Sequence, residues 1–254
     1  MNFYSAFVKM LPAHALALLE KVLYNVHEKN GEGEYMRIIE LKETVTASND
    51  RDAEVLRNEL KTKGTLLINL MASPGAGKTT LLERTIRDMK DRFRIAVMEA
   101  DVDSDVDAVR IEKLGAKAVQ AHTGGMCHMD AGMTRTALDE LGEEPFDLVV
   151  LENVGNLICP AEFDTGAGKK VMLLSVPEGD DKPLKYPLMF TVSDVLIITK
   201  TDVAPYFDFD FEACKKRARG LNPNVEIFEV SSKTGDGFAA WEKWLEKAIS
   251  DWKK

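Results

Sequence analysis

The sequence Leu-Leu-Ile-Asn-Leu-Met (residues 66–71) is followed directly by Ala-Ser-Pro-Gly-Ala-Gly-Lys-Thr (residues 72–79). The apolar run predicts a buried strand, and the Thr-Leu-Leu-Glu at residues 80–83 predicts the start of a helix. A strand, a glycine-bearing loop and a helix start form the context in which backbone N–H groups converge on phosphate. This stretch therefore predicts a phosphate-binding loop (P-loop) and a nucleoside triphosphate as ligand.

The residues of this loop have distinct expected roles. Glycines 75 and 77 leave room for phosphate because they carry no Cβ. We expect Lys78 to neutralise the β- and γ-phosphates and the Thr79 hydroxyl to ligate Mg²⁺. Ala72 stands where the usual pattern begins with glycine, a minor departure because alanine is also small. The predicted nucleotide-binding residues of the loop are Gly75, Ala76, Gly77, Lys78, Thr79 and Thr80.

Composition narrows the classes of protein. A chain of 254 residues, 45% of them hydrophobic, has material for one nucleotide-binding domain and an appendage. The net charge of −9 argues against a nucleic-acid surface, which needs basic patches. No apolar run approaches the roughly 20 residues that span a bilayer, and residues 10–19 do not form a signal peptide. We expect a cytoplasmic protein with reduced thiols and neither nucleic-acid nor membrane partners.

The alternation of apolar runs with helical patterns from residue 64 onward is typical of an α/β fold. It predicts a doubly wound, mostly parallel sheet of the P-loop GTPase type. A helix at Phe238–Trp252 closes the chain. The expected strands are Thr65–Met71, Arg94–Ala100, Lys117–Ala121, Asp147–Leu151, Lys170–Ser175, Val195–Thr199 and Val225–Val230.

We assign residues 64–254 to this domain and residues 1–63 to an N-terminal helical extension. The extension has two expected helices, at Ala13–Val26 and at Ser48–Lys61, of which the second is charged and expected to pack against the domain. Gly-Glu-Gly-Glu at residues 31–34 corresponds to purine-rich codons just ahead of the Met36 codon. One hypothesis is a translated ribosome-binding site, which would make residues 1–35 foreign to the native protein. A genuine helical appendage is the other, and N-terminal sequencing distinguishes them.

Carboxylates are expected at the ends of two further strands. Glu152 follows the apolar residues 147–151, where an acid associated with Mg²⁺ belongs, and we expect contact through a metal-bound water. Gly155 is expected to offer its N–H to the γ-phosphate. Asp101 is interpreted as a Mg²⁺-water ligand or as a group that orients the attacking water. The expected catalytic residues are Lys78, Asp101 and Glu152, and the expected Mg²⁺ site consists of Thr79, Asp101 and Glu152.

The acids that begin at residue 101 allow a second interpretation. Their spacing fits positions 1, 3, 5, 7 and 12 of a calcium-binding loop: Asp101, Asp103, Asp105, Asp107 and Glu112. That loop needs a glycine at position six, where this chain has Val106, and a helix before it, where the pattern predicts a strand. Both departures disfavour calcium.

Two loops near the C-terminus favour guanine as the base. The carboxylate of Asp202 can accept hydrogen bonds from guanine N1–H and its exocyclic amine, a donor pair that adenine lacks. The stem of Lys200 can cover the ring. Ser-Ser-Lys-Thr at residues 231–234 fits a second guanine loop, with Ser232 and Lys233 as expected contacts. Thr199 stands where the common motif has asparagine.

A second site is predicted around a thiol and an imidazole. Cys127 and His128 are adjacent in a glycine-rich loop just before a predicted helix, and Cys159 follows the Glu152 strand. Thiolate and imidazole suit Zn²⁺ or Ni²⁺, and ligand type does not choose between them. A helix N-terminus is expected to lower the pKa of a thiol there. Because one chain offers at most three such ligands, a two-fold dimer would complete the coordination across its interface. A structural Cys-His pair is the alternative.

One further histidine and one further cysteine are not expected to bind the metal directly. His122 lies near the Cys-His pair and is expected outside the ligand set, in the layer around it. Cys214 falls on a charged helix predicted at Phe211–Arg219 and is expected to be a packing residue.

Together these segments resemble the hydrogenase-maturation nickel-insertion GTPases (the HypB family). The resemblance implies GTP hydrolysis coupled to homodimerisation, and delivery of Ni²⁺ to a [NiFe]-hydrogenase large-subunit precursor alongside a nickel-carrying accessory protein. It implies that the family's interface metal ligands fall on Cys127, His128 and Cys159. This sequence has neither the N-terminal cysteine cluster nor the histidine-rich tract of some relatives. The matching stretches are Ser73–Glu83, Asp101–Arg110, Thr123–Ala131, Glu152–Pro160 with Phe163-Asp164, Glu178–Tyr186 and Ser231–Gly237.

The sequence also predicts how the sites communicate. Cys159 lies seven residues beyond Glu152, so a loop ordered by the γ-phosphate would move a metal ligand. Lys182 or Lys185 is expected to reach nucleotide or partner, or else to belong to a solvated charged loop. Three alternative functions stay open: a urease-type nickel-insertion GTPase, a zinc-binding regulatory module that uses GTP as a dimerisation ligand, and a P-loop small-molecule kinase.

Overall fold

The described part of the chain forms a parallel sheet between two layers of helices. This computed structural model describes residues 41–101 and 110–254. The predictions for the helix Ala13–Val26, for a start at Met36 and for the acidic run at residues 102–109 lie outside the described residues. Among the helices that the structure describes, none has the length and apolar character needed to cross a bilayer.

The sheet has the strand order β3-β2-β4-β1-β5-β6-β7, and every neighbouring pair is parallel. The predicted fold class and all the predicted strands are confirmed, with no bound shifted by more than one residue. β1 lies between β4 and β5, at the point where the winding of the sheet reverses, and the carboxyl ends of strands at such a point form a binding crevice. The strands are β1 Leu66–Ala72, β2 Ile95–Asp101, β3 Lys117–His122, β4 Leu148–Glu152, β5 Lys169–Ser175, β6 Val195–Thr199 and β7 Glu226–Glu229.

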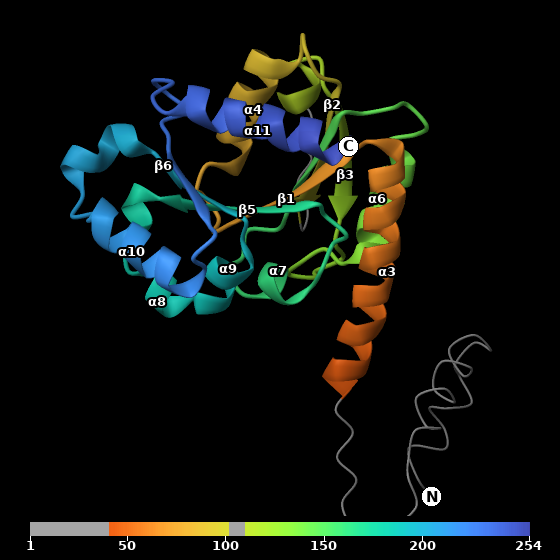
Figure 1. Cartoon of the computed structure of the whole chain (residues 1–254), viewed down its shortest axis with the longest axis horizontal. Helices are drawn as coiled ribbons and strands as arrows, with labels where there is room; N and C mark the ends of the chain where they lie inside the picture. The colour runs from red at the N-terminus through yellow and green to blue at the C-terminus, as the bar shows by residue number, and fades with distance from the viewer. Residues whose placement is uncertain (1–40, 102–109) are drawn as a thin grey trace, which may run out of the picture. The chain divides into compact units, whose positions relative to one another are not determined.

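Helices cover both faces of this sheet. Figure 1 shows α4 and α11 on one face and α7 to α10 on the other. The hydrogen-bonded turn that follows β5 and the segment that follows β6 are the 3₁₀ helices η1 (Val176–Glu178) and η2 (Thr201–Tyr206). The helices are α3 Leu41–Lys63, α4 Lys78–Met89, α6 Ala131–Glu140, α7 Cys159–Glu162, α8 Lys182–Lys185, α9 Pro187–Val192, α10 Phe211–Leu221 and α11 Phe238–Trp252.

The core follows from the alternation of side chains along the central strands. Leu66, Ile68 and Leu70 of β1 pack in the cluster beneath α4 and α11, whereas Leu67 belongs to the cluster on the opposite face. Because successive strand residues point to opposite faces, an unbroken apolar run is what a strand buried on both sides requires. The predicted buried strand at residues 65–71 is therefore confirmed.

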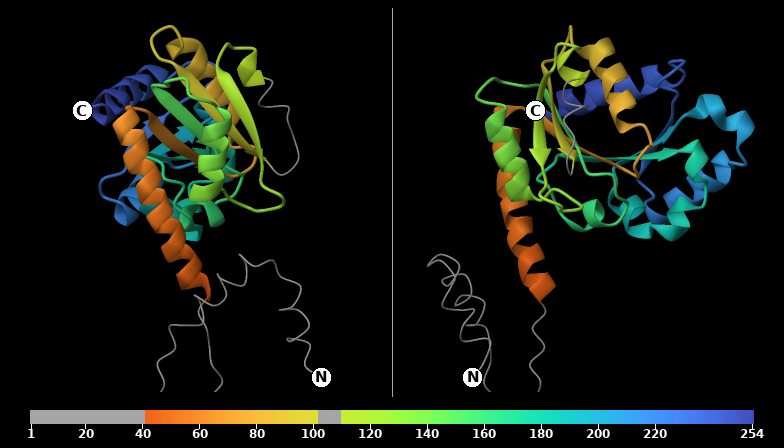
Figure 2. Two further views of the ribbon diagram at one scale, coloured as in Figure 1. Left: turned by 90° about the vertical axis from the view of Figure 1, so that its right-hand side faces the viewer. Right: turned by 180° about the vertical axis from the view of Figure 1, so that it is seen from behind.

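The charged helix predicted at Ser48–Lys61 is part of the longer α3. It lies beside α6 in both views of Figure 2. Leu56 and Leu60 of α3 pack with Leu67 of β1 and Met98 of β2, so the helix contributes to the core of the nucleotide-binding unit. The division of the chain at residues 63 and 64 stays a prediction.

Candidate functional site

The P-loop joins β1 to α4 at the carboxyl edge of the sheet. Gly75 and Gly77 have φ values of 75° and 101°, in the left-handed region that favours glycine. The loop borders a cavity of about 580 Å³ that is also lined by Lys78, Thr79 and Glu152. Thr80, Gly155 and Lys200, three further residues predicted from sequence, line it as well.

Two of the three residues expected to hold Mg²⁺, Thr79 and Glu152, meet in the lining of this cavity. The Thr79 hydroxyl donates a hydrogen bond to Glu152 Oε1 at 3.0 Å, and Lys78 Nζ lies 4.0 Å from the same oxygen. A hydroxyl and a carboxylate oxygen at the foot of a phosphate cradle fit the hard-oxygen preference of Mg²⁺. Asp101 is the last residue of β2, and its side chain lies outside the described part of the chain.

Gly155 brings the Glu152 loop against the P-loop. A Cβ at this position would lie 2.9 Å from Pro74 Cγ and 3.0 Å from the Pro74 nitrogen. Glycine is therefore required for the two loops to approach each other so closely. Gly155 thereby lines the phosphate cavity, and its contact to the γ-phosphate stays a prediction.

The predicted guanine loops form a smaller hollow beside the phosphate cavity. Asp202, Ser232 and Lys233 line it together with Ala76 and Thr80. The Ser231 hydroxyl donates to Asp202 Oδ1 at 2.7 Å, which orients the carboxylate expected to read the base.

Lys200 and Thr199 anchor this hollow to the P-loop. Lys200 has a φ of 59°, and its Nζ donates to the Gly75 carbonyl at 2.6 Å. The Thr199 hydroxyl donates to the Ala76 carbonyl at 2.7 Å. A threonine in place of the usual asparagine therefore still supplies a hydrogen-bond donor to the phosphate-binding loop.

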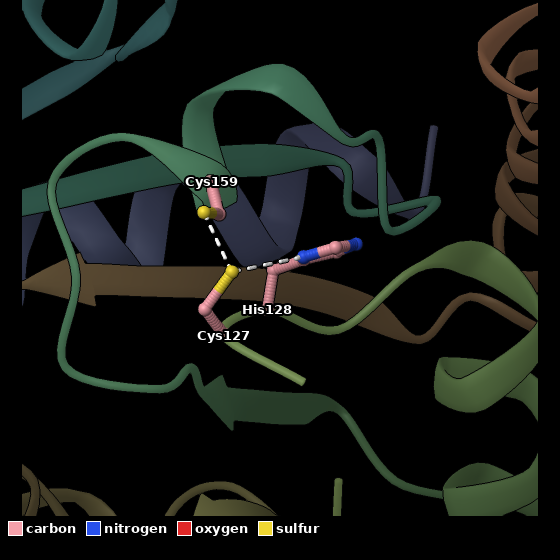
Figure 3. A group of neighbouring side chains, drawn as sticks. All are labelled: Cys127, His128 and Cys159. Atoms are coloured by element: carbon pink, nitrogen blue, oxygen red, sulfur yellow. Dashed lines mark hydrogen bonds between the residues drawn. The ribbon is translucent and has the colours of Figure 1, made fainter. Parts of the chain in front are cut away.

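The predicted metal ligands come together from two separate loops. The ligand atoms of Cys127, His128 and Cys159 lie within 4.8 Å of one another (Figure 3). The two thiols are 2.6 Å apart, and Cys127 Sγ is 3.7 Å from His128 Nδ1. Sulfur and imidazole nitrogen are donors that Zn²⁺ and Ni²⁺ accept, so these three residues would hold such an ion.

The imidazole of His128 is held by a stacking contact. Its ring lies on the ring of Phe163 with centroids 3.8 Å apart and an interplanar angle of 14°. Nδ1 faces Cys127, whereas Nε2 is buried and has no hydrogen-bond partner among the described residues. Burial lowers the pKa of His128, although the nearby charges of Asp130 and Glu162 oppose that shift. A neutral imidazole with Nδ1 directed at a thiol is suited to metal ligation.

One expectation about the thiols is wrong. Cys159 is the first residue of α7, yet its pKa is raised, first by the hydrogen bond that it shares with Cys127 and then by burial. The effect of the backbone at the helix start is smaller than these two. Metal binding therefore has to displace a proton from the thiol pair rather than find a thiolate already formed.

Comparisons with known proteins show the family of this chain. The sequence profile described as "CobW/HypB/UreG, nucleotide-binding domain" matches residues 66–229. The hydrogenase maturation factor HypB of Rhizobium leguminosarum bv. viciae is 45% identical over 210 residues, which cover 83% of this chain and 70% of that protein. The chain belongs to the HypB family.

Two further relatives extend the comparison. The hydrogenase/urease maturation factor HypB of Helicobacter hepaticus is 42% identical over 213 residues, covering 82% of this chain and 87% of that one. The crystal structure of HypB from Helicobacter pylori in complex with nickel has a TM-score of 0.76 and 40% identity, covering 82% of this chain and 98% of that one. The HypB fold and its nucleotide-binding domain are thus present here.

Several residues of this HypB-family site escaped the sequence analysis. Glu99, Gln120 and Asn153 all line the phosphate cavity. Glu99 is 4% exposed, and the strand register sets it opposite Glu152 on one side and Gln120 on the other. The sequence signal that could have identified Glu99 is an acidic residue inside the otherwise apolar strand at residues 95–100.

Two minor predictions have different outcomes. Cys214 is fully buried in α10, and burial raises its pKa to about 12, so the predicted packing role is confirmed. His122 is exposed at the end of β3 and lies outside the Cys127, His128 and Cys159 cluster, as expected, while its place in the layer around that cluster stays a prediction.

Proposed function

We propose that this HypB-family chain is a GTP-hydrolysing metallochaperone. It binds Ni²⁺ or Zn²⁺ through Cys127, His128 and Cys159 at a homodimer interface and supports nickel insertion into a [NiFe]-hydrogenase precursor. The observation that carries the proposal is that one loop serves both sites. It leaves β4 at Glu152, passes the P-loop at Gly155 and delivers Cys159 to the second cysteine.

The nucleotide chemistry follows from the cavity. Lys78 and the P-loop amides would neutralise the phosphates, and Asp202 would select guanine. Thr79 and Glu152 would hold Mg²⁺, whose positive charge would offset the negative charge of the phosphate oxygens in the transition state. Glu152 is buried, which strengthens its interaction with any cation placed there.

The metal site has the features of a transfer site. Cys127 and Cys159 remain partly exposed, and each follows a large exposed apolar residue, Met126 and Ile158 respectively. Exposed apolar side chains around an incomplete ligand set favour closure by a second protein surface. A second copy would double the ligands, and the nickel-carrying accessory protein and the hydrogenase precursor are the further partners in this proposal.

Metal content and GTP turnover of the purified protein test the proposal. We expect about half to one equivalent of Ni²⁺ or Zn²⁺ per chain, depending on whether two chains share one ion. Cys127→Ala and His128→Ala should lose this metal, and Lys78→Ala should lose turnover. Cys214→Ala is the matched control because it also removes a thiol. Equal metal binding by the wild type and both ligand variants would contradict the proposed metallochaperone function.

A urease-type nickel-insertion GTPase is the second candidate, because the Helicobacter hepaticus relative is called a hydrogenase/urease maturation factor. Activation assays with apo-hydrogenase and apo-urease distinguish the two. Turnover below detection, with intact GTP-dependent dimerisation, would instead favour the zinc-binding regulatory module.

A further inference from the structure

Among the α3 side chains that the structure describes, Asn49 is a buried polar residue within an apolar stripe. Ala53, Leu56 and Leu60 point into the core at 0%, 3% and 5% exposure. Asn49, four residues before Ala53, lies on the same face and is 9% exposed. A buried amide costs stability unless its donor and acceptor are both satisfied, so an asparagine here calls for specific partners.

The partners of Asn49 are the two loops that carry the metal ligands. Its Nδ2 donates to the backbone carbonyl of Asp164 at 2.9 Å, and its Oδ1 accepts from the backbone N–H of Ala131 at 2.9 Å. Ala131 begins α6, three residues after His128, and Asp164 directly follows Phe163. One side chain therefore joins the loop of the imidazole to the loop of the ring on which it stacks.

A second residue of the same helix strengthens this attachment. Arg57 Nη2 donates to Asp164 Oδ2 at 2.6 Å, and its Nε donates to the Ala167 carbonyl at 3.0 Å. Asp164 is thus held to α3 by both its backbone and its carboxylate. Because α3 also packs on the core through Leu56 and Leu60, it is a firm support for these bonds.

We propose that Asn49 is a positioning residue for the metal site. Its amide holds the His128–Phe163 stack together and so keeps Nδ1 directed at Cys127. This inference rests on the proposed metal-binding function. It concerns a residue outside the profile match, which begins at residue 66. Groups that orient metal ligands from outside the ligand set typically change metal affinity by about 10- to 100-fold when removed.

The effect on metal affinity is measured with Ni²⁺ alone, titrated against a competing chelator. We expect Asn49→Ala to weaken Ni²⁺ binding about tenfold or more, with GDP affinity unchanged. Asn49→Asp keeps the acceptor for Ala131 but turns a charged oxygen toward the Asp164 carbonyl in place of the donor, and it provides a second test if Asn49→Ala does not fold. The matched control is Thr62→Ala on the same helix, because the exposed Thr62 hydroxyl bonds only to the Asn58 carbonyl of α3 itself.

A metal-free readout separates this inference from the proposed function. The Phe163 ring should shift the imidazole resonances of His128 upfield, and these resonances are assigned by their loss in His128→Gln. We expect the shift to shrink in the folded Asn49 variants and to persist in Thr62→Ala. Wild-type affinity and an unchanged ring-current shift in those variants would overturn the positioning role. If wild type bound no Ni²⁺, the proposed function would fail, and the resonances alone would decide the role of Asn49.

Discussion

The side-chain carbonyl of Asn153 accepts a hydrogen bond from the backbone N–H of Met129 at 3.2 Å. Asn153 directly follows Glu152 of the nucleotide cavity, and Met129 directly follows His128 of the metal cluster. The Asn153 amide nitrogen donates to Asn69 Oδ1 on β1 at 3.0 Å. Because Asn153 is fully buried, these bonds have no competing water, and their loss would leave buried groups unsatisfied. The two sites are therefore joined through a side chain as well as through the chain between Glu152 and Cys159.

Removal of this connection should reduce the coupling between nucleotide and metal. We expect the ratio of Ni²⁺ affinities in the GDP and GTP-analogue states to fall toward one in Asn153→Ala, because the imidazole loop no longer follows the Glu152 strand end. A tenfold ratio corresponds to about 1.4 kcal/mol of coupling, and it must appear equally in the nucleotide affinities with and without metal. Isothermal titration calorimetry measures this coupling twice, once by titrating Ni²⁺ in each nucleotide state and once by titrating nucleotide with and without Ni²⁺.

The control for this prediction is Asn222→Ala. Asn222 also donates its amide to backbone carbonyls, those of Thr191 and Ser193, in another part of the fold. The control should keep the wild-type ratio. A folded Asn153→Ala protein with the wild-type ratio would show that the coupling runs elsewhere.

Thr199 provides a test of the P-loop anchor. In Thr199→Val the shape is retained and the bond to the buried Ala76 carbonyl is lost, which leaves that oxygen unpaired. We expect GTP and GDP to bind about 5- to 30-fold more weakly, since roughly 1–2 kcal/mol of loop ordering is lost. Thr199→Asn restores a donor and should bind nucleotide nearly as wild type does. Equal weakening in both variants would mean that bulk at this position, and not the hydrogen bond, matters.

The P-loop, the strands and the residue types of the Cys127, His128 and Cys159 cluster were predictable because their signals are local in sequence. An apolar run followed by Gly-Lys-Thr specifies strand, turn and helix within some twenty residues. Cys127 follows β3 and Cys159 follows β4. The carboxyl ends of parallel strands lie at the same edge of the sheet, which explains why the two cysteines come together. Local pattern also located Asp202, since its loop follows β6 directly.

The residues that were missed act over long distances in sequence. Asn49 reaches Asp164 across 115 residues and Ala131 across 82, and within α3 it looks like one polar residue of a charged helix. The raised pKa of Cys159 likewise arises from Cys127 in another loop, which outweighs the helix start next to it. Sequence identifies residue types, whereas these effects depend on which loops the fold brings into contact.

Cys214 should be chemically silent in the folded protein. Burial raises its pKa to about 12, so at pH 8 only about one molecule in ten thousand carries the reactive thiolate. Mass spectrometry after brief treatment with iodoacetamide should find Cys127 and Cys159 labelled and Cys214 labelled only in denaturant. Ni²⁺ should protect the first two and leave the third unchanged. Rapid labelling of Cys214 in native protein would show that α10 opens far more readily than its packing indicates.

Asp147 couples the C-terminus to the sheet and makes stability depend on pH. Its carboxylate accepts from Lys253 Nζ at 2.5 Å and from the Arg94 backbone N–H at 2.7 Å. Burial acts to raise the pKa of Asp147, but these hydrogen bonds outweigh it and hold the pKa below its ordinary value. A lowered folded-state pKa stabilises the fold above the unfolded-state value, and this stability is lost as the pH falls through the folded-state value.

Two adjacent lysines provide the matched pair that tests this. Lys253→Met removes a charged partner of a buried carboxylate and should cost about 1–2 kcal/mol in urea unfolding at pH 7. Lys254 bonds to the exposed Asp251, so Lys254→Met should cost nothing measurable. Because the interaction needs an ionised Asp147, the difference between Lys253→Met and wild type should shrink as the pH falls from 5 to below 3. A difference that stayed constant across that range would mean that Lys253 stabilises the protein by packing rather than through the Asp147 carboxylate.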